Sequence, residues 1–432
     1  MLVDSTADST ALLTDHYELT MLQAALKAGT AERRAVFELF PRRLAGGRRY
    51  GVVAGVGRAL DAIEAFRFDS EQLAILEGVV DGPTLEWLAG YRFTGDAWGY
   101  AEGETFFPQS PLLVVEASFA EAVVLETVLL SIYNHDSAIA TAASRMTLAA
   151  GERPCIEMGS RRTHEAAAVA AARAAYVAGF TATSNLAARA RFGVPTTGTS
   201  AHSFTLLHDT EEQAFRAQVA SLGKGTTLLV DTYDIAEAVA KAVEIAGPEL
   251  GAVRIDSGDL GLLAHDVRRQ LDDLGATATK IIVTSDLDEY AIAGLAAAPV
   301  DGYGVGTQLV TGSGHPTAGF VYKLVAREGA SGELEPVAKK SASKTSIGGR
   351  KYALRRRNRK DVADAEVIGI GTAPDGDNND RPLLTQLVRK GEVVGREPLD
   401  AARDRHRASV AELPVIAHSL LKGDPAIPTQ FI

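Results

Sequence analysis

The feature that most constrains the fold is a unit that the chain repeats four times between Leu228 and Thr311. Each unit is a short apolar run that ends abruptly in acids or glycines, as in TTLLVDTYD, GAVRIDSGD, KIIVTSDLDE and VDGYGVGTQ. The runs have the length and the β-branched residues of strands, and stretches with helical periodicity follow the first three. Successive β-α units of this kind predict a parallel sheet or barrel.

The ends of these four runs carry the first candidate functional residues. Ligands of parallel α/β folds bind at the carboxyl ends of the strands, so residues there are expected to share one rim. The rim residues predicted in this way are Asp231, Asp234, Asp256, Asp259, Asp286, Asp288, Gly304 and Gly306. Several carboxylates beside a glycine turn suit a magnesium-bound sugar phosphate, so the pattern predicts an enzyme.

Composition restricts the class of protein further. The 432 residues predict two or three domains, and 46% hydrophobic and 23% charged residues are ordinary for a globular protein. A net charge of −11 argues against general nucleic-acid binding. Cys155 is the single cysteine, which favours the reducing cytoplasm, and the acidic N-terminus lacks a secretory signal. Glu116, Glu121 and Glu126 interrupt the most apolar stretch, so no membrane span is expected.

An acidic protein that binds an anion needs local cations, and the sequence gathers them in two places. One is Arg161 and Arg162, after the strand-like CIEMGS, with a salt bridge to a rim acid as the alternative. The other is the basic run Lys339–Lys360, although a solvated loop or hairpin is the alternative for its Arg355–Arg359 part. Arg254 lies inside the apolar run GAVRIDSG, so it is expected to be paired or to point at a carboxylate ligand. The chain has neither a Walker loop nor zinc-type spacing, nor the acid-acid loop of ordinary purine and pyrimidine phosphoribosyltransferases.

His202 is the candidate nucleophile or base. It follows the apolar run and Gly-Thr turn of VPTTGTSAHSF, and its ordinary pKa of about 6.5 leaves it mostly neutral at pH 7. Asp231 and Asp234, one strand further on, are expected to orient its ring. The alternative is a histidine that only forms a hydrogen bond within its loop.

Outside the repeats, the pattern predicts an α+β region and several separate elements. Residues 14–29, 120–146 and 399–414 are expected to be helices, and VFELFPRR and YGVVAGV are expected to be strands. PLLTQLVRKGEVVG predicts a hairpin, and APDGDNNDRP predicts a loop.

As a set, these motifs resemble those of the nicotinate phosphoribosyltransferase family. The resemblance runs over most of the chain, through LLTDHYELTM, FELFPRR, VEASFAEAVVLETVLLSIYN, EMGSRR, TATSN, GVPTTGTSAHS, VDTYD, VRIDSGD, SDLDE, GYGVGTQLVT, FVYKLV and KKSASKTSIGGRK. It implies an irregular α/β barrel of the type II phosphoribosyltransferase kind, with an N-terminal α+β domain completed by C-terminal segments. The implied domains are residues 1–125, a barrel over 126–340, and a C-terminal segment over 341–432 that packs back on the N-terminal domain.

The resemblance also implies an activity. Enzymes of the family make nicotinate mononucleotide and diphosphate from nicotinate and 5-phosphoribosyl 1-diphosphate, driven by ATP, as the first step of NAD salvage. They act as cytoplasmic homodimers with shared active sites, and they use Mg²⁺. Three other functions stay open: a nicotinamide or quinolinate phosphoribosyltransferase, a sugar-phosphate lyase or isomerase that needs no ATP, and a silent nucleotide-binding protein.

Positions in the matching motifs carry the implied roles. His202 corresponds to the transiently phosphorylated histidine, with Asp231 and Asp256 as its catalytic neighbours and with Asp256 and Asp286 at the metal. The implied substrate-binding residues are Tyr17, which stacks on the pyridine ring from the partner subunit, together with Met158, Arg161, Asn185, Arg254, Ser285, Gly306 and Thr307.

Two of these positions bear on the choice of substrate. Enzymes for nicotinamide resemble one another in having an acid where this chain has Asn185, and an aspartate there would repel a carboxylate. Asn185 therefore favours nicotinate. Met158 stands where those enzymes place an aromatic residue under the ring, so stacking is expected from one side only.

Overall fold

The computed structural model describes residues 9–339 and 346–432, and the chain divides into two compact units. Unit 1 comprises residues 1–141 and 315–432, and unit 2 comprises residues 142–314. The expected boundaries after residues 125 and 340 lie outside unit 2 at both ends. Two elements explain this, because the long helix α6 (Glu126–Ala150) begins in unit 1 and β12 (Phe320–Glu328) belongs to the unit 1 sheet.

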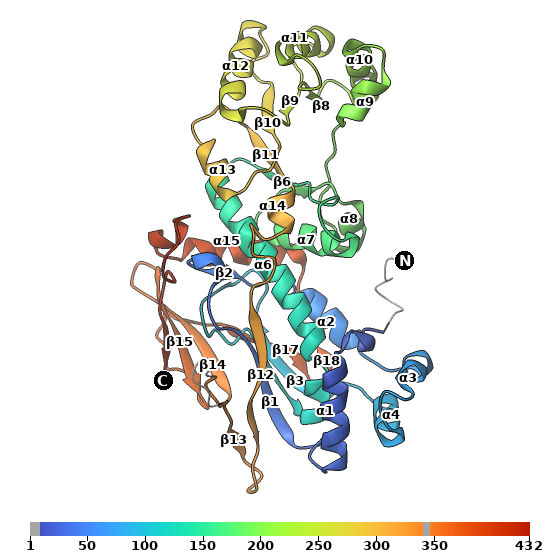
Figure 1. Cartoon of the computed structure of the whole chain (residues 1–432). Coiled ribbons are helices and arrows are strands. Elements are labelled where there is room, and N and C mark those ends of the chain that lie inside the picture. Colours follow the sequence, from blue (N-terminus) through green and yellow to red (C-terminus); the bar gives the residue numbers. More distant parts are fainter. Residues whose placement is uncertain (1–8, 340–345) are drawn as a thin grey trace. The chain divides into compact units, whose positions relative to one another are not determined.

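Unit 1 is built on a seven-stranded sheet in the order β13-β12-β1-β5-β3-β17-β18. Its strands are β1 (Arg34–Pro41), β3 (Asp96–Tyr100), β5 (Leu113–Ser118), β12, β13 (Leu334–Pro336), β17 (Leu384–Arg389) and β18 (Glu392–Val393). The two longest strands, β1 and β12, lie side by side and antiparallel although they are far apart in the sequence (Figure 1). The strand predicted for VFELFPRR is thus confirmed as β1, at the centre of the sheet.

Helices and short elements from the N-terminal part complete this unit. They are η1 (Ala11–Leu13), α1 (His16–Lys27), η2 (Ala45–Gly47), α2 (Val56–Ala65), α3 (Ser70–Leu76) and α4 (Gly82–Ala89). Of the predicted strand YGVVAGV, only β2 (Gly51–Val52) forms, and it pairs with β4 (Thr105–Phe106). Gly55 explains the difference: its φ of 91° turns the backbone into α2, which begins at the next residue.

The helix expected over residues 120–146 is two helices, α5 (Phe119–Val123) and α6. Ser118 and Glu121 form a capping box that opens α5. The buried Glu18 carboxylate of α1 accepts a hydrogen bond from the backbone N–H of Thr127, 2.9 Å away, and another from its hydroxyl. Glu18 therefore supplies an acceptor to the first turn of α6, where backbone N–H groups lack helical partners.

The C-terminal part of unit 1 adds a four-stranded sheet in the order β16-β14-β15-β19. Its strands are β16 (Arg381–Pro382), β14 (Lys351–Arg357), β15 (Ala363–Ile370) and β19 (Thr429–Phe431), and α15 (Leu399–Ala411) and η3 (Val415–His418) lie between β18 and β19 in the sequence. The predicted C-terminal helix is thus confirmed. So is the predicted hairpin, β17–β18, in which Lys390 (φ 48°) and Gly391 (φ 82°) form the turn.

The Arg355–Arg359 run is only partly solvated. Arg355 lies on β14 with no exposed surface, and its guanidinium is 2.9 Å from Glu366 and 3.0 Å from Glu412. Arg381 joins the same network at 2.7 Å from Glu104. Of the alternative of a solvated loop or hairpin, the hairpin is confirmed, because β14 pairs antiparallel with β15 and Arg355 lies opposite Glu366. Solvation is wrong for Arg355, whose buried guanidinium lies among three carboxylates and Arg381, whereas Arg359 is exposed. Lys340–Thr345 of the basic run lie outside the described residues.

Unit 2 is a half-barrel of six parallel strands in the order β7-β6-β11-β10-β9-β8. They are β6 (Cys155–Glu157), β7 (Ala182–Thr183), β8 (Thr227–Leu229), β9 (Ala252–Ile255), β10 (Lys280–Val283) and β11 (Gly302–Val305). The helices are α7 (Glu165–Val177), α8 (Leu186–Phe192), α9 (His202–Leu207), α10 (Glu211–Leu222), α11 (Ile235–Ala246), α12 (Leu260–Asp273), α13 (Glu289–Gly294) and α14 (Thr307–Val310). Helices α10, α11 and α12 form a row beside β8, β9 and β10 (Figure 1). The four predicted β-α units are confirmed.

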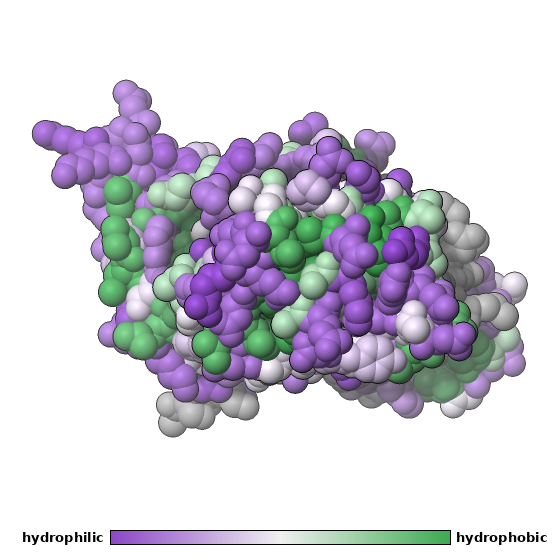
Figure 2. Space-filling model, turned by 90° about the horizontal axis from the view of Figure 1, so that it is seen from above, coloured by the Kyte–Doolittle hydropathy of each residue, from purple (hydrophilic) through white to green (hydrophobic). Residues whose placement is uncertain are grey.

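The surface is mixed in character. In the view of Figure 2, hydrophilic side chains predominate and hydrophobic ones form separate patches between them. Within residues 9–339 and 346–432, no helix combines the length and the apolar character that crossing a membrane requires.

The buried network around Arg355 predicts a stability difference between two neighbouring arginines. Replacing Arg355 by alanine leaves Glu366 buried without its cation, which should cost about 3–5 kcal/mol of unfolding free energy. The exposed Arg359, replaced in the same way, should change it by less than about 0.5 kcal/mol. Urea unfolding of both variants measures the difference, and equal losses would contradict the assignment of Arg355 to a buried network.

Candidate active site

The carboxyl ends of the six parallel strands of unit 2 bring together polar groups from the loops that follow them. Adjacent strands run in the same direction, so the residues that follow each strand arrive at the same edge of the sheet. A chain of contacts runs along this edge from the loop after β8 to the loop after β7. It places most of the residues predicted from the sequence in one continuous site.

His202 is the first residue of α9, and both of its ring nitrogens face polar groups. Nδ1 lies 3.1 Å from the hydroxyl of Thr232, in the loop after β8. Nε2 lies 3.9 Å from Oδ1 of Asp231 and 3.9 Å from Oδ2 of Asp256. These last distances are too long for hydrogen bonds, so the two carboxylates act on the imidazole through their charge. The His202 side chain is 40% exposed, which leaves it open to a ligand.

Asp231 connects the ends of β8 and β9. Its Oδ2 accepts hydrogen bonds from the backbone N–H of Asp256 (2.9 Å) and from the hydroxyl of Ser257 (2.8 Å). Its Oδ1 is buried and accepts no hydrogen bond from any described residue. Asp256 is fixed in turn by the Thr284 hydroxyl, which follows β10 and donates to Oδ1. Oδ2 of Asp256 is therefore the oxygen that is left for a ligand.

Three of the acids predicted at this rim have a different role. Asp234, Asp259 and Asp288 are the N-cap residues of α11, α12 and α13, and each side chain accepts from a backbone N–H of its own helix. The expectation that Asp234 orients His202 is therefore wrong, and Thr232 makes that contact instead. A carboxylate between a strand and a helix commonly caps the helix, because the first helical N–H groups lack partners.

The loop after β10 carries a backbone conformation that is unusual for its residue. Ser285 has a φ of 142°, in a region that side chains other than glycine rarely adopt, and such strain is concentrated at functional sites. The next residue, Asp286, is exposed, and its loop follows β10, the strand that pairs with β9.

Glycines in and after β11 allow close packing at the centre of the site. A Cβ atom at Gly304 would lie 2.5 Å from Thr284 and 2.7 Å from the sulfur of Met158, so a side chain there would displace both. Gly306 ends the strand and caps α14, whose first residue is Thr307. Met158, the first residue after β6, thus packs its sulfur against Gly304 of the neighbouring strand β11.

A second group of contacts holds the loops after β6 and β7 together. The buried Glu157 carboxylate accepts from the backbone N–H of Gly159 and from the hydroxyl of Thr183. Burial raises the pKa of Glu157, and these two hydrogen bonds oppose that change. Asn185 follows β7, and its Nδ2 donates to the hydroxyl of Ser160 at 3.0 Å. Glu157 therefore fixes both loops that flank Met158.

Arg254 is a half-buried cation without a carboxylate partner among the described residues. It donates to the hydroxyl of Thr199, and it forms no ion pair with a described carboxylate. Its Nε is buried and has no hydrogen-bond partner. Burial lowers the pKa of its guanidinium, the positive charge of Arg161 lowers it further, and Asp256 and Asp231 oppose the change. The positive charges of Arg254 and Arg161 thus favour an anionic ligand at this end of the site.

The remaining predicted residue, Tyr17, belongs to unit 1. It lies on α1 and is 44% exposed, so the alternative of a buried core tyrosine is wrong. Partial burial raises the pKa of its hydroxyl, as do the charges of Glu126 and Glu18 and a hydrogen bond to Glu126. That hydrogen bond orients the side chain and leaves much of the ring accessible.

The sequence interpretation missed several side chains of this site, namely Thr183, Thr199, Thr232, Ser257, Thr284, Ser160 and Glu157. All of them except Glu157 are hydroxyls, and hydroxyls are too common in loops for a sequence pattern to single them out. Glu157 could have been predicted from the sequence, because a carboxylate inside the apolar run CIEM requires buried hydrogen-bond partners, just as Arg254 does in its strand.

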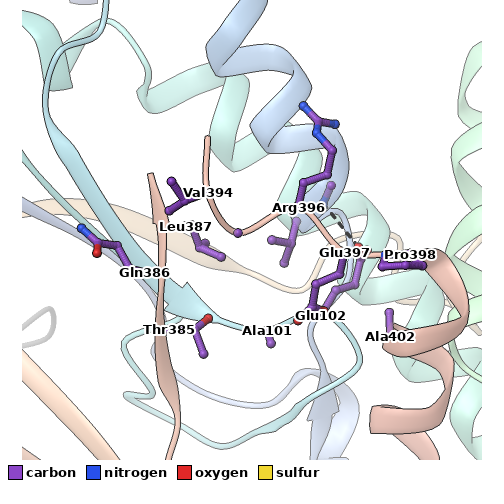
Figure 3. A pocket seen from close by; sticks show the side chains of 13 residues that line it. Ala101, Glu102, Thr385, Gln386, Leu387, Val394, Arg396, Glu397, Pro398 and Ala402 are labelled. Carbon is purple, nitrogen blue, oxygen red and sulfur yellow. Dashed lines mark hydrogen bonds between the residues drawn. The ribbon is translucent and has the colours of Figure 1, made fainter. Parts of the chain in front are cut away.

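A separate cavity of about 240 Å³ lies within unit 1, beside α2, β17 and α15 (Figure 3). Its polar groups already have partners in the protein. Glu102 accepts from the backbone N–H groups of Gly55 and Gly57 at the start of α2, and Arg396 pairs with Asp61 and Glu64 of the same helix. No residue predicted to act in catalysis lines this cavity.

The half-barrel and the polar row along its strand ends define an α/β enzyme that binds an anionic ligand. Comparison with known proteins narrows the class. The sequence model of the nicotinate phosphoribosyltransferase (NAPRTase) N-terminal domain matches residues 12–134. Nicotinate phosphoribosyltransferase pncB1 of Mycobacterium tuberculosis is 56% identical over 434 aligned residues, which cover 98% of this chain and 96% of that protein.

Two further comparisons agree. The nicotinate phosphoribosyltransferase of Bacillus subtilis is 39% identical over 362 residues, covering 81% of this chain and 73% of that protein. The crystal structure of human nicotinic acid phosphoribosyltransferase matches with a TM-score of 0.83 and 25% identity, over 96% of this chain and 97% of that one. The chain belongs to the nicotinate phosphoribosyltransferase family of enzymes.

Proposed function

We propose that the protein transfers the phosphoribosyl group of 5-phosphoribosyl 1-diphosphate to the ring nitrogen of nicotinate, releasing diphosphate, as the first step of NAD salvage. ATP hydrolysis drives the reaction through a transient phosphohistidine at His202. Two relatives that are 56% and 39% identical over most of the chain are nicotinate phosphoribosyltransferases. This similarity supports nicotinate, and not nicotinamide or quinolinate, as the substrate. A lyase or isomerase without ATP has no support from these relatives.

The observation that carries the ATP-dependent step is the surroundings of His202. A histidine becomes a nucleophile when one ring nitrogen is held by a hydrogen bond and the other is free to attack. Thr232 contacts Nδ1, while the carboxylates of Asp231 and Asp256 face Nε2. Attack on the γ-phosphoryl group of ATP forms an N–P bond and releases ADP. The positive charge that develops on the ring is stabilised by the two carboxylates.

The other end of the site fits a pyridine carboxylate. Met158 offers an apolar contact to the ring, and Arg161 and Arg254 provide two positive charges that pair with no carboxylate in residues 9–339 and 346–432. An arginine pairs well with a carboxylate because its N–H groups match the two oxygens. Backbone N–H groups after Gly306, with the Thr307 hydroxyl, are the donors that we assign to the phosphate of the second substrate.

Mg²⁺ is the proposed metal, and the donor set fits the way in which this ion usually binds. Among residues 9–339 and 346–432, no three histidine, cysteine or acidic side chains converge as a complete metal cage. Mg²⁺ commonly takes one or two carboxylates and completes its shell with water and substrate phosphates, neutralising a diphosphate leaving group when bound. Asp256, whose Oδ2 is free of hydrogen bonds, and the exposed Asp286 would hold it.

We further propose a homodimer with shared active sites. Large apolar side chains are exposed next to the strand ends of unit 2, namely Leu186, Leu206, Leu207, Tyr233 and Leu262. A partner subunit that covers them would remove this apolar surface from water. In unit 1, Tyr17 presents a half-exposed ring that is suited to stacking on a pyridine in the partner's site.

Replacing His202 by alanine should abolish the stimulation of nucleotide synthesis by ATP, because the phosphoryl acceptor is lost. His208, at the end of the same helix, contacts the carbonyl of Phe204 and serves as the control. The His208→Ala variant should keep the stimulation. Product formation with and without ATP, together with label transfer from γ-labelled ATP to the protein, measures the effect. A His202→Ala variant that still hydrolyses ATP in step with product would contradict the role of His202.

Replacing Asp256 by asparagine should raise the Mg²⁺ concentration needed for half-maximal activity, because one anionic ligand is lost. Asp259→Asn is the matched control, since asparagine caps a helix as well as aspartate does. A magnesium titration of both variants checks this. An unchanged requirement in Asp256→Asn would remove Asp256 from the metal site.

Mixing Tyr17→Ala protein with His202→Ala protein should restore part of the activity if each site combines residues of two subunits. Exchanged dimers would contain one complete site, whereas neither variant alone has any. Subunit exchange is verified with differently tagged chains, and Tyr17→Phe should keep its activity because the ring is retained. Exchanged dimers without recovered activity would place Tyr17 outside the partner's site.

A further inference from the structure

Glu289 is a buried carboxylate of unit 2 to which the proposed reaction gives no role. It is the first residue of α13, and its side chain is 3% exposed. Its Oε1 accepts a hydrogen bond from Nε of Arg145 on α6 at 2.9 Å, and its Oε2 accepts one from the hydroxyl of Ser313 at 2.7 Å. Burial raises the pKa of Glu289, but the hydrogen bonds from Ser313 and Arg145 lower it by more, so the carboxylate is ionised at neutral pH.

On one side, Glu289 fixes the loop that follows β10. Asp286, the acid proposed to bind Mg²⁺, lies three residues before Glu289. Between them, the side chain of Asp288 caps α13, and the loop begins at Ser285 with its strained φ of 142°. The segment from Asp286 to the helix is thus short and tightly turned. A carboxylate anchored at the first residue of the helix therefore restricts the movement of Asp286.

On the other side, Glu289 fixes the turn that follows β11. Ser313 lies just beyond α14, the short helix that begins at Thr307, and its backbone N–H donates to the carbonyl of Gln308 at 2.7 Å. Its φ of 51° lies between those of two glycines, 64° and 79°, in a left-handed conformation that favours glycine. Serine is unfavourable at this backbone position, and what it supplies there is the hydroxyl that donates to Glu289.

The bridge fixes direction more than it adds stability. Burying an ion pair gains little free energy, because the loss of hydration offsets most of the attraction between the charges. The two oxygens of a carboxylate lie at a fixed angle, and here each takes its donor from a different element. Arg145, whose side chain is 6% exposed, balances the charge. Glu289 thus sets the spacing between the start of α13 and the end of α14.

We propose that Glu289 is a positioning residue that holds the loop of Asp286 and the phosphate turn at Thr307 at a fixed separation. This inference rests on the proposed function. 5-phosphoribosyl 1-diphosphate carries its phosphate and its diphosphate at opposite ends of the ribose. The phosphate is assigned to the turn after β11, and the diphosphate, with Mg²⁺, to the loop after β10. Both ends bind together only when this spacing matches the substrate, whereas nicotinate, beside Met158, does not depend on it.

Two substitutions break the bridge in different ways. Ser313→Gly removes the hydroxyl, and glycine suits the left-handed backbone at this position, so the fold is kept. Glu289→Gln keeps one acceptor oxygen, which cannot accept from both Arg145 and Ser313. Thermal unfolding of each variant verifies that it folds.

Each variant should raise the dissociation constant of 5-phosphoribosyl 1-diphosphate, measured by calorimetry with Mg²⁺ present, about tenfold, because its two ends are no longer held in register. KM for nicotinate, and label transfer from γ-labelled ATP to His202, should stay at their wild-type values. Ser313→Gly in the Glu289→Gln background should add little, because the bridge is already broken.

Tyr290→Phe is the matched control. It removes a hydroxyl that lies 3.3 Å from the Arg145 guanidinium, and it leaves both hydrogen bonds of Glu289 in place. All three measured quantities should keep their wild-type values in this variant.

Two failures are distinguishable. If a folded Ser313→Gly variant binds 5-phosphoribosyl 1-diphosphate as tightly as the wild type does, or if its KM for nicotinate rises by the same factor, Glu289 only supports the fold and the inference is overturned alone. A wild type that does not bind 5-phosphoribosyl 1-diphosphate, or that forms no nucleotide from it and nicotinate, overturns the proposed function together with the inference.

Discussion

Parallel pairing of six strands decides where the polar groups of unit 2 lie. Since all six strands run in one direction, the residue after each strand arrives at the same edge, and loops that are far apart in the sequence become neighbours. The hydrogen bond from the N–H of Asp256 to Asp231 connects two such ends directly. A register shift of one residue would turn these side chains to the opposite face and separate them.

Sequence reasoning succeeded where a residue type was unusual for its position. Three features each require a polar partner or a ligand. They are the acids Asp231 and Asp256 at the ends of apolar runs, the arginine inside the apolar run of β9, and the histidine just past a Gly-Thr turn. The structure places His202, Asp231 and Asp256 within 4 Å contacts of one another and leaves Arg254 without a carboxylate partner. These features follow from the cost of burying unpaired polar groups, which a sequence pattern can reveal.

Other features depend on geometry that no local pattern encodes. Asp234 and Asp231 stand three residues apart and are chemically identical, yet one caps a helix and the other faces a histidine. The first turn of α6 finds an acceptor in Glu18, more than 100 residues earlier in the sequence. Burial of Arg355 likewise required three glutamates from separate elements. Each outcome is decided by a tertiary contact and not by the residue's neighbours in the sequence.

The discontinuity of unit 1 has a consequence for how the protein is made. Its central strand β1 pairs on one side with β12, and the strand β19 near the C-terminus pairs with β15, so the unit needs both ends of the chain. Unit 2 occupies one continuous segment and is complete in sequence before β12 leaves the ribosome. During synthesis, one edge of β1 therefore lacks its native partner while unit 2 can already fold. During this interval β1 offers to other molecules the edge that β12 covers in the finished fold.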